Sequence, residues 1–97
     1  MENQQLAGRF KALADETRLK VVQILTTEKR CACQILEVFK ISQSTLSHHM
    51  KRLVESGLVI AEKEGKWVYY RLNEDNVNDL KVFFDTIGTR TDPVRSC

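Results

Sequence analysis

Two cysteines one residue apart, Cys31 and Cys33, have the residue type and spacing in this chain that are best suited to chemistry. Thiolates bind soft metal and metalloid ions, and thiols are also oxidised reversibly. Closely spaced cysteines within an odd total of three favour metal or redox chemistry over a structural disulfide. The third, Cys97, is the last residue. The alternative interpretation is that Cys31 and Cys33 are small buried apolar residues and that Cys97 is an idle terminal residue.

The one-residue spacing constrains any site that the pair shares. Side chains two positions apart on a regular helix diverge by about 200°, so their sulfur atoms cannot converge without local distortion. A frayed start of the segment over residues 31–39 would escape this limit. Distortion forced by a ligand would itself be a switching mechanism.

The helix that follows the cysteines has a polar face suited to DNA. An apolar stripe marks its buried side within residues 43–56 and consists of Leu46, Met50, Leu53 and Val54. The polar and basic side chains outside this stripe are candidate contacts to base edges and phosphates. They are Gln43, Ser44, Thr45, Ser47, His48, Lys51 and Arg52.

Two adjacent histidines, His48 and His49, lie in this helix. Because neighbouring helical residues point in different directions, the two rings are poorly placed to share one ion. We therefore interpret His48 as a DNA contact and His49 as a hydrogen-bonding residue at the edge of the helix packing.

Apolar periodicity and turn signals predict a mainly helical domain with one β-hairpin. We expect helices over residues 4–14, 16–27, 31–39, 43–56 and 75–87, and strands over residues 58–63 and 66–72. Asp15 is a good N-cap for the second helix, which is apolar on nearly all sides and should be buried. Gly57 suits a left-handed helix cap, and Gly65 suits the hairpin turn. This order of elements is a winged helix-turn-helix.

Basic residues gather in the middle of the chain. Residues 40–72 contain six basic and three acidic side chains, whereas residues 73–92 contain two basic and five acidic ones. The hairpin contributes Lys63, Lys66 and Arg71, which are candidate contacts to the DNA backbone. The formal net charge is only +2, but this distribution is expected if only the middle faces phosphate. A chance fluctuation in a small sample is the alternative.

The chain length of 97 residues predicts one domain with a limited core. We expect a DNA-binding and dimerisation domain over residues 1–90 and a flexible tail over residues 91–97. The last helix carries a large apolar stripe, which consists of Val77, Leu80, Phe83, Phe84 and Ile87. The stripe predicts a homodimer contact, or alternatively the monomer's own core. No targeting signal and no apolar run of about 18 residues are evident, so we expect a cytoplasmic protein with no membrane partner.

Four segments in this order resemble the ArsR/SmtB family of metal-sensing winged-helix repressors. Residues 12–19 (ALADETRL) look like the entry to its second helix, and residues 42–50 (SQSTLSHHM) resemble its recognition helix. Residues 55–59 (ESGLV) and 65–72 (GKWVYYRL) are similar to its wing. The resemblance covers about residues 5–87. It is arsenic-repressor-like, because the cysteine pair falls where the arsenic, cadmium and lead sensors carry Cys-x-Cys.

The resemblance implies a symmetric dimer, built from the first and last helices, that represses as the apo form and leaves operator DNA when ligand binds. Three departures bear on the ligand. The best-known arsenic repressors have a third cysteine a few residues beyond the pair, where this chain has Leu36 and Glu37. Cadmium sensors recruit N-terminal cysteines, which this sequence does not contain. Zinc and nickel sensors often use histidine and aspartate on the last helix, and residues 75–87 contain no histidine.

The number of thiols then distinguishes among ligands. A tetrahedral zinc or cadmium site needs four good ligands, whereas Cys31, Cys33 and Cys97 suffice for trivalent arsenic or antimony. The leading hypothesis is a transcriptional repressor released by As(III) or Sb(III), with no organic cofactor. The alternatives are a thiol-redox or sulfur-responsive repressor, a cadmium, lead or zinc sensor, and a metal carrier that does not bind DNA. An enzyme is not expected, because no phosphate loop, acid pair or cysteine–histidine catalytic set is recognisable.

Overall fold

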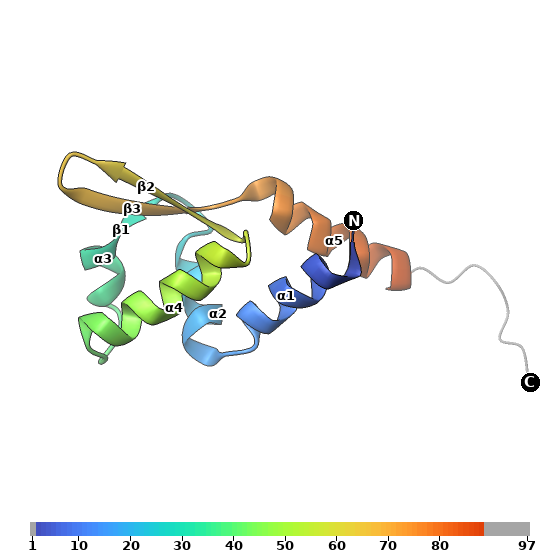
Figure 1. Cartoon of the computed structure of the whole chain (residues 1–97), viewed down its shortest axis with the longest axis horizontal. Helices are drawn as coiled ribbons and strands as arrows, with labels where there is room; N and C mark the ends of the chain where they lie inside the picture. The colour runs from blue at the N-terminus through green and yellow to red at the C-terminus, as the bar shows by residue number, and fades with distance from the viewer. Residues whose placement is uncertain (1, 89–97) are drawn as a thin grey trace, which may run out of the picture.

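The computed structural model describes residues 2–88, and Figure 1 shows helices packed below and beside a small antiparallel sheet at one edge of the domain. The elements are α1 (Asn3–Leu13), α2 (Glu16–Ile24), β1 (Arg30–Cys31), α3 (Ala32–Leu36), α4 (Gln43–Glu55), β2 (Val59–Glu64), β3 (Trp67–Leu72) and α5 (Glu74–Gly88). In Figure 1, α1 and α5 lie at one end of the domain, α3 and the β2–β3 hairpin lie at the other, and α4 runs between them. The predicted tail over residues 91–97 lies outside the described residues.

The sheet has the strand order β1-β3-β2, with both pairings antiparallel. The predicted hairpin is confirmed, and its turn places Gly65 at φ 62°, a left-handed conformation that favours glycine. The first strand was not predicted: Cys31 was expected to begin a helix, but it pairs with Tyr69 on β3. A strand of two residues is too short to show the alternation by which strands are recognised in sequence.

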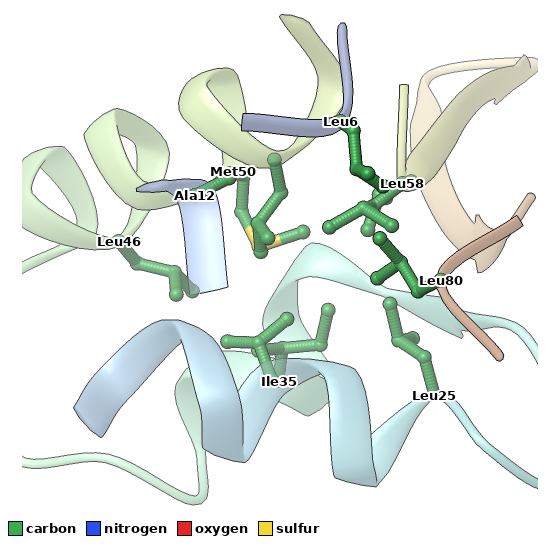
Figure 2. Close-up of a cluster of buried hydrophobic side chains, with 11 residues drawn as sticks. Leu6, Ala12, Leu25, Ile35, Leu46, Met50, Leu58 and Leu80 are labelled. Carbon is green, nitrogen blue, oxygen red and sulfur yellow. The ribbon is translucent and has the colours of Figure 1, made fainter. Parts of the chain in front are cut away.

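The core is formed where the helices meet the base of the sheet. Figure 2 shows labelled side chains of α1, α3, α4 and α5 pointing toward one another, together with Leu25 after α2 and Leu58 after α4. The fully buried members are Val21, Ile35, Met50, Leu53, Leu58 and Val59. Ile35 comes from the short helix α3, so the segment that carries the cysteines is attached to the same core as α4.

The expectation that the second helix is buried on nearly all sides is wrong. Val21 is inaccessible to solvent, but Leu19 on the same helix is 45% exposed. The helix also ends at Ile24, with Leu25 as its C-cap, rather than at Thr27. In Figure 2, α2 lies along the lower border of the core, with the cluster of buried side chains on one side of it.

Helix α4 follows the predicted pattern closely. Its inner face buries Leu46, Met50 and Leu53, and Ser42 caps its N-terminus by accepting a hydrogen bond from the Thr45 amide. At the other end Gly57 has φ 86°, as expected of a left-handed cap. The exposed side of α4 is therefore held in a fixed orientation relative to the sheet.

Candidate nucleic-acid interface and thiol pair

The seven residues of α4 that the sequence nominates for DNA contact are all exposed. Those of the first turn lie next to the cap: the Ser42 hydroxyl donates to Thr45 Oγ1 at 2.8 Å and lies 3.1 Å from Ser44 Oγ. An exposed helix N-terminus offers unpaired amide groups and a positive dipole, both of which favour contact with phosphate. The geometry of α4 is therefore compatible with insertion of its first turns into a major groove.

The later turns of α4 carry the cationic part of this face. Arg52 Nε donates to His48 Nε2 at 3.2 Å, so this ring nitrogen acts as an acceptor and the ring proton is assigned to Nδ1. Lys51 lies 4.0 Å from Glu55 one turn later. Surface pairs of this kind contribute little to stability and can exchange their partner for a phosphate.

The wing residues have different electrostatic surroundings. Lys63 and Lys66 are exposed near the hairpin turn, and the Lys66 ammonium lies 5.5 Å from the centre of the Trp67 ring. Arg71 lies farther from the turn and donates to Glu62 at 2.6 Å, so a carboxylate offsets its charge. Lys29, which sequence reasoning did not nominate, reaches the hairpin by an ion pair with Glu64 at 3.0 Å. No local sequence signal predicts this contact, because the two residues belong to different elements.

His49 links α4 to the junction of α1 and α2. Arg18 Nη1 lies 3.2 Å from His49 Nδ1, while Arg18 Nε donates to the carbonyl oxygen of Ala12 at 2.6 Å. Since a guanidinium only donates, His49 Nδ1 is the acceptor of this hydrogen bond. This is the hydrogen-bonding position at the edge of the helix packing that the sequence predicts for His49.

The two cysteine sulfur atoms converge. Cys31 is the N-cap of α3 with an extended backbone, φ −78° and ψ 158°, and Cys33 lies in the first turn of that helix. Cys31 Sγ and Cys33 Sγ are in direct contact, so that one thiol can donate its hydrogen to the other. The divergence expected of two helical residues does not apply, because Cys31 belongs to a strand. Its amide donates to Gln34 Oε1 at 2.9 Å, which fixes the start of α3.

The two thiols differ in acidity and exposure. The hydrogen bond from Cys33 lowers the pKa of Cys31, with a smaller contribution from the backbone amide of Gln34. The pKa of Cys33 is raised, because its proton is held in the bond to Cys31 and because of desolvation. Cys31 is buried and Cys33 is exposed. The pair therefore supplies one sulfur that ionises early and one that solvent reaches.

A third ligand is not found near the pair in the part of the chain that the structure describes. Within residues 2–88, no three or more histidine, cysteine, aspartate or glutamate side chains gather as a metal site would require. Cys97, the predicted third ligand, lies outside the described residues. Its assignment stays a prediction.

Sequence comparison identifies the family. Residues 15–61 match the family described as bacterial regulatory protein, arsR family. An arsenical resistance operon repressor of Staphylococcus aureus is 39% identical over 89 residues, which are 92% of this chain and 86% of the relative. The chain belongs to the ArsR family. The arsenical resistance operon repressor of Bacillus subtilis (strain 168) is 42% identical over 73 residues, which are 74% of this chain and 70% of that relative.

Solved structures agree with this membership. A crystal structure of a possible transcriptional regulator for arsenical resistance matches with a TM-score of 0.76 and 31% identity, covering 86% of each chain. A homodimeric winged helix-turn-helix DNA-binding domain from Mycobacterium bovis, solved in solution, matches with a TM-score of 0.73 and 29% identity over 88% of this chain and 79% of that chain. The predicted winged helix-turn-helix is confirmed, and this ArsR-family chain is a transcriptional repressor rather than an enzyme. None of the helices within residues 2–88 has the length and apolar character needed to cross a membrane.

Proposed function

We propose that this ArsR-family repressor binds operator DNA as a homodimer and releases it when As(III) or Sb(III) binds Cys31 and Cys33. The observation that carries the proposal is the convergence of the two sulfur atoms at the start of α3, the helix before the turn that leads into α4. Soft thiolates select soft ions. The named relatives are arsenical resistance repressors, which supports a metalloid as the inducer.

The proposed switch acts through the start of α3. A bridging ion would set the separation of the two sulfur atoms by its own bond lengths and angle, and would so shift Cys31 and Cys33 relative to each other. Cys31 is held by β3 through the sheet, so the movement falls mainly on Cys33 and α3. Since Ile35 of α3 is packed in the core with α4, displacement of α3 changes the orientation of the DNA-reading helix.

The proposed dimer uses α1 and α5. Phe10 of α1 packs edge-on against Phe83 and Phe84 of α5, with ring centres 5.5 Å apart in both pairs. The same region leaves Phe84 55% exposed and Ile87 63% exposed. Apolar side chains exposed to this extent on a small domain favour contact with a second copy. A two-fold dimer would present two α4 helices to an imperfect inverted repeat.

The proposed DNA contacts combine recognition and attraction. Ser44, Thr45, Ser47 and His48 approach base edges or phosphates, together with Gln43 in the same helical turn. Lys51 and Arg52 of α4, and Lys63, Lys66 and Arg71 of the wing, contact phosphates. Because phosphate contacts release counterions, operator affinity should fall steeply as the salt concentration rises. Fluorescence anisotropy with labelled upstream DNA measures this dependence, and an affinity independent of salt would contradict the proposal.

The test of sensing uses the thiols directly. Cys31→Ser and Cys33→Ser should each leave operator affinity nearly unchanged and abolish release by arsenite, since neither side chain belongs to the DNA-facing set. The readout is arsenite titration of the operator complex, with the wild type as reference and Ser56→Ala, at the far end of α4, as a control variant that keeps release. Release of the double cysteine variant at wild-type arsenite concentrations would place the sensing site elsewhere.

The role of Cys97 needs a separate test. Trivalent arsenic prefers three sulfur ligands, so Cys97→Ser should weaken arsenite binding, but less than loss of Cys31 or Cys33 because water or a free thiol can fill the third position. Docking a chain terminus also costs conformational entropy, which offsets part of the gain. X-ray absorption at the arsenic edge, without added thiol, counts the sulfur ligands. Three sulfurs in both wild type and variant would remove Cys97 from the site.

A thiol-redox repressor of the same fold is the second candidate. It is favoured by the contact between the two sulfur atoms and by the exposure of Cys33. Peroxide treatment followed by intact mass measurement detects a loss of two hydrogen atoms, or an added oxygen, if the pair is oxidised. Release of DNA by peroxide together with no response to arsenite would favour this candidate over the metalloid repressor.

A further inference from the structure

A cavity of about 370 Å³ adjoins the thiol pair on its exposed side. It lies between α3, the first half of α4 and β3, and Cys33 forms part of its wall. The rest of the wall is largely apolar and is formed by Leu36, Leu46, Met50, Trp67, Val68 and Tyr70. Three residues proposed to contact DNA also line it, and these are Gln43, Ser47 and Lys66. An apolar chamber thus opens beside a sulfur that can bind a soft ion.

We propose that this cavity holds the organic group of a mono-substituted trivalent arsenical, R–As(III), whose arsenic is bound by Cys31 and Cys33. The proposal rests on the metalloid-responsive function proposed above and specifies its inducer class. An aryl or similarly apolar group is the substituent that matches the cavity wall.

The number of described thiols suits this ligand. An arsenic atom that already carries one carbon substituent needs only two sulfur ligands to complete its three bonds. Within residues 2–88, Cys31 and Cys33 supply those two. The hydrated reagent R–As(OH)₂ reacts with two thiols to give R–As(S-Cys)₂ and two molecules of water. Two As–O bonds break, two As–S bonds form, each thiol proton leaves in water, and arsenic stays trivalent, so no oxidant or reductant is needed.

The size and position of the cavity favour both binding and switching. An apolar cavity of about 150 Å³ is enough to hold benzene, so 370 Å³ accommodates a phenyl group with room to spare. Trp67, which is 51% exposed to solvent, supplies an aromatic wall. A bound ring would separate α4 from the wing, because the cavity lies between them. Such an inducer would act on both DNA-contacting elements at once.

Phenylarsine oxide is the probe, and inorganic arsenite is its reference. Calorimetric titration of the full chain, reduced with a phosphine rather than a thiol, should give one phenylarsine oxide per chain with an affinity at least about tenfold above that of arsenite, owing to burial of the ring. Trp67 is the only tryptophan, so its fluorescence reports on the cavity directly. We expect a larger fluorescence change with phenylarsine oxide than with arsenite.

Three variants separate the cavity from the thiols. Trp67→Ala should lower phenylarsine oxide affinity about fivefold or more and leave arsenite affinity unchanged. Glu62→Ala, on the neighbouring strand β2 and outside the cavity wall, is the control and should change neither. Ala32 of α3 also lines the cavity. Ala32→Leu should therefore exclude the phenyl group while arsenite still binds, which keeps the test valid if Trp67→Ala fails to fold. Cys97→Ser should leave phenylarsine oxide affinity intact.

The outcomes distinguish this inference from the function on which it rests. If arsenite binds and releases DNA but phenylarsine oxide gains no affinity, or if Trp67→Ala and Ala32→Leu affect both arsenicals equally, the cavity assignment is wrong and the metalloid repressor stands. A loss of phenylarsine oxide affinity in Cys97→Ser would likewise overturn the two-thiol site. If neither arsenical binds, or if binding survives loss of Cys31 and Cys33, both proposals fail.

Discussion

The two ends of α4 are held in different ways. At the C-terminal end, Arg9 of α1 donates to the Ser56 carbonyl at 3.4 Å and Asn76 of α5 donates to the Gly57 carbonyl at 2.8 Å. Arg9 is also paired with Asp79 of α5 at 3.1 Å. At the N-terminal end, Ser42 caps α4 through a residue of the same helix. This end adjoins α3 and the cavity beside it.

This difference suggests how one helix can serve two purposes. The C-terminal end is tied to α1 and α5, the helices that we propose form the dimer. The N-terminal end, which carries most of the residues proposed to read bases, adjoins the thiol pair instead. Ligand binding at the cysteines can therefore tilt the DNA-reading end while the dimer contact stays in place.

Breaking the anchored end at Arg9 should have the largest effect on stability. Arg9 is 8% exposed, so Arg9→Ala removes a buried cation that pairs with Asp79 and hydrogen-bonds to Ser56. We expect a loss of about 2 kcal/mol, below the value for a fully buried pair because the Asp79 side chain is 40% exposed to screening solvent. Urea unfolding measures this loss in the free energy of unfolding, and Lys11→Ala, at an exposed position of the same helix, is the control. Equal effects of the two variants would show that the anchor is unimportant.

Gly57→Ala should disturb the same end somewhat less. Gly57 has φ 86°, which disfavours alanine, and an added Cβ would lie 2.9 Å from Nδ2, the side-chain amide nitrogen of Asn76. We expect a loss of about 1.5 kcal/mol. The matched control is Gly65→Ala, where φ is 62° but nothing lies within 4 Å, so that it tests the backbone strain alone. If both variants lose the same free energy of unfolding, the close approach of Asn76 contributes nothing.

The cap of α2 offers a pH-dependent test away from both ends. The hydrogen bond from the Arg18 amide lowers the pKa of the Asp15 carboxyl, desolvation opposes this shift, and the charge of the Arg18 guanidinium lowers the pKa further. Because the pKa of Asp15 is lower in the folded protein than in the unfolded chain, this stabilisation is fully present at pH values above the unfolded-state pKa. It is lost as the pH falls through the folded-state pKa. Asp15→Ala should cost about 1 kcal/mol at neutral pH and less in acid, as unfolding by urea at both pH values would show. A loss of stability that is independent of pH would contradict this account. Asp15→Asn is the control, because asparagine can still cap the helix but has no carboxyl group to titrate.

The smallest effect is expected at the thiol end. Cys33 is exposed, so Cys33→Ser should change the free energy of unfolding by less than about 0.5 kcal/mol while it abolishes release by arsenite. This combination separates signalling from stability. Hydrogen exchange along α4 sharpens the comparison: arsenite should alter exchange in the first turns of the wild type and leave the last turn unchanged. Uniform changes along α4 would show that its two ends are not independent.

Local rules account for much of what could be predicted. The Asp15 cap, the stripe of Leu46, Met50 and Leu53, and the left-handed Gly57 follow from interactions within a few residues, and all appear in the structure. The hairpin likewise follows from alternation around Gly65. The second helix shows where such rules fail, since the exposure of Leu19 depends on which elements lie beside it and not on its own periodicity.

The candidate site divides in the same manner. Sequence alone is enough to predict that two thiols precede a helix suited to DNA contact, because both features are contiguous stretches of chain. The convergence of the sulfur atoms becomes evident only in three dimensions, since Cys31 pairs with Tyr69, a residue far along the sequence, and so lies outside the helix. The anchor from Arg9 to Asp79 and the cavity beside Trp67 also join distant segments. Contacts of this kind depend on the closure of the whole chain around its core, and no local pattern records them.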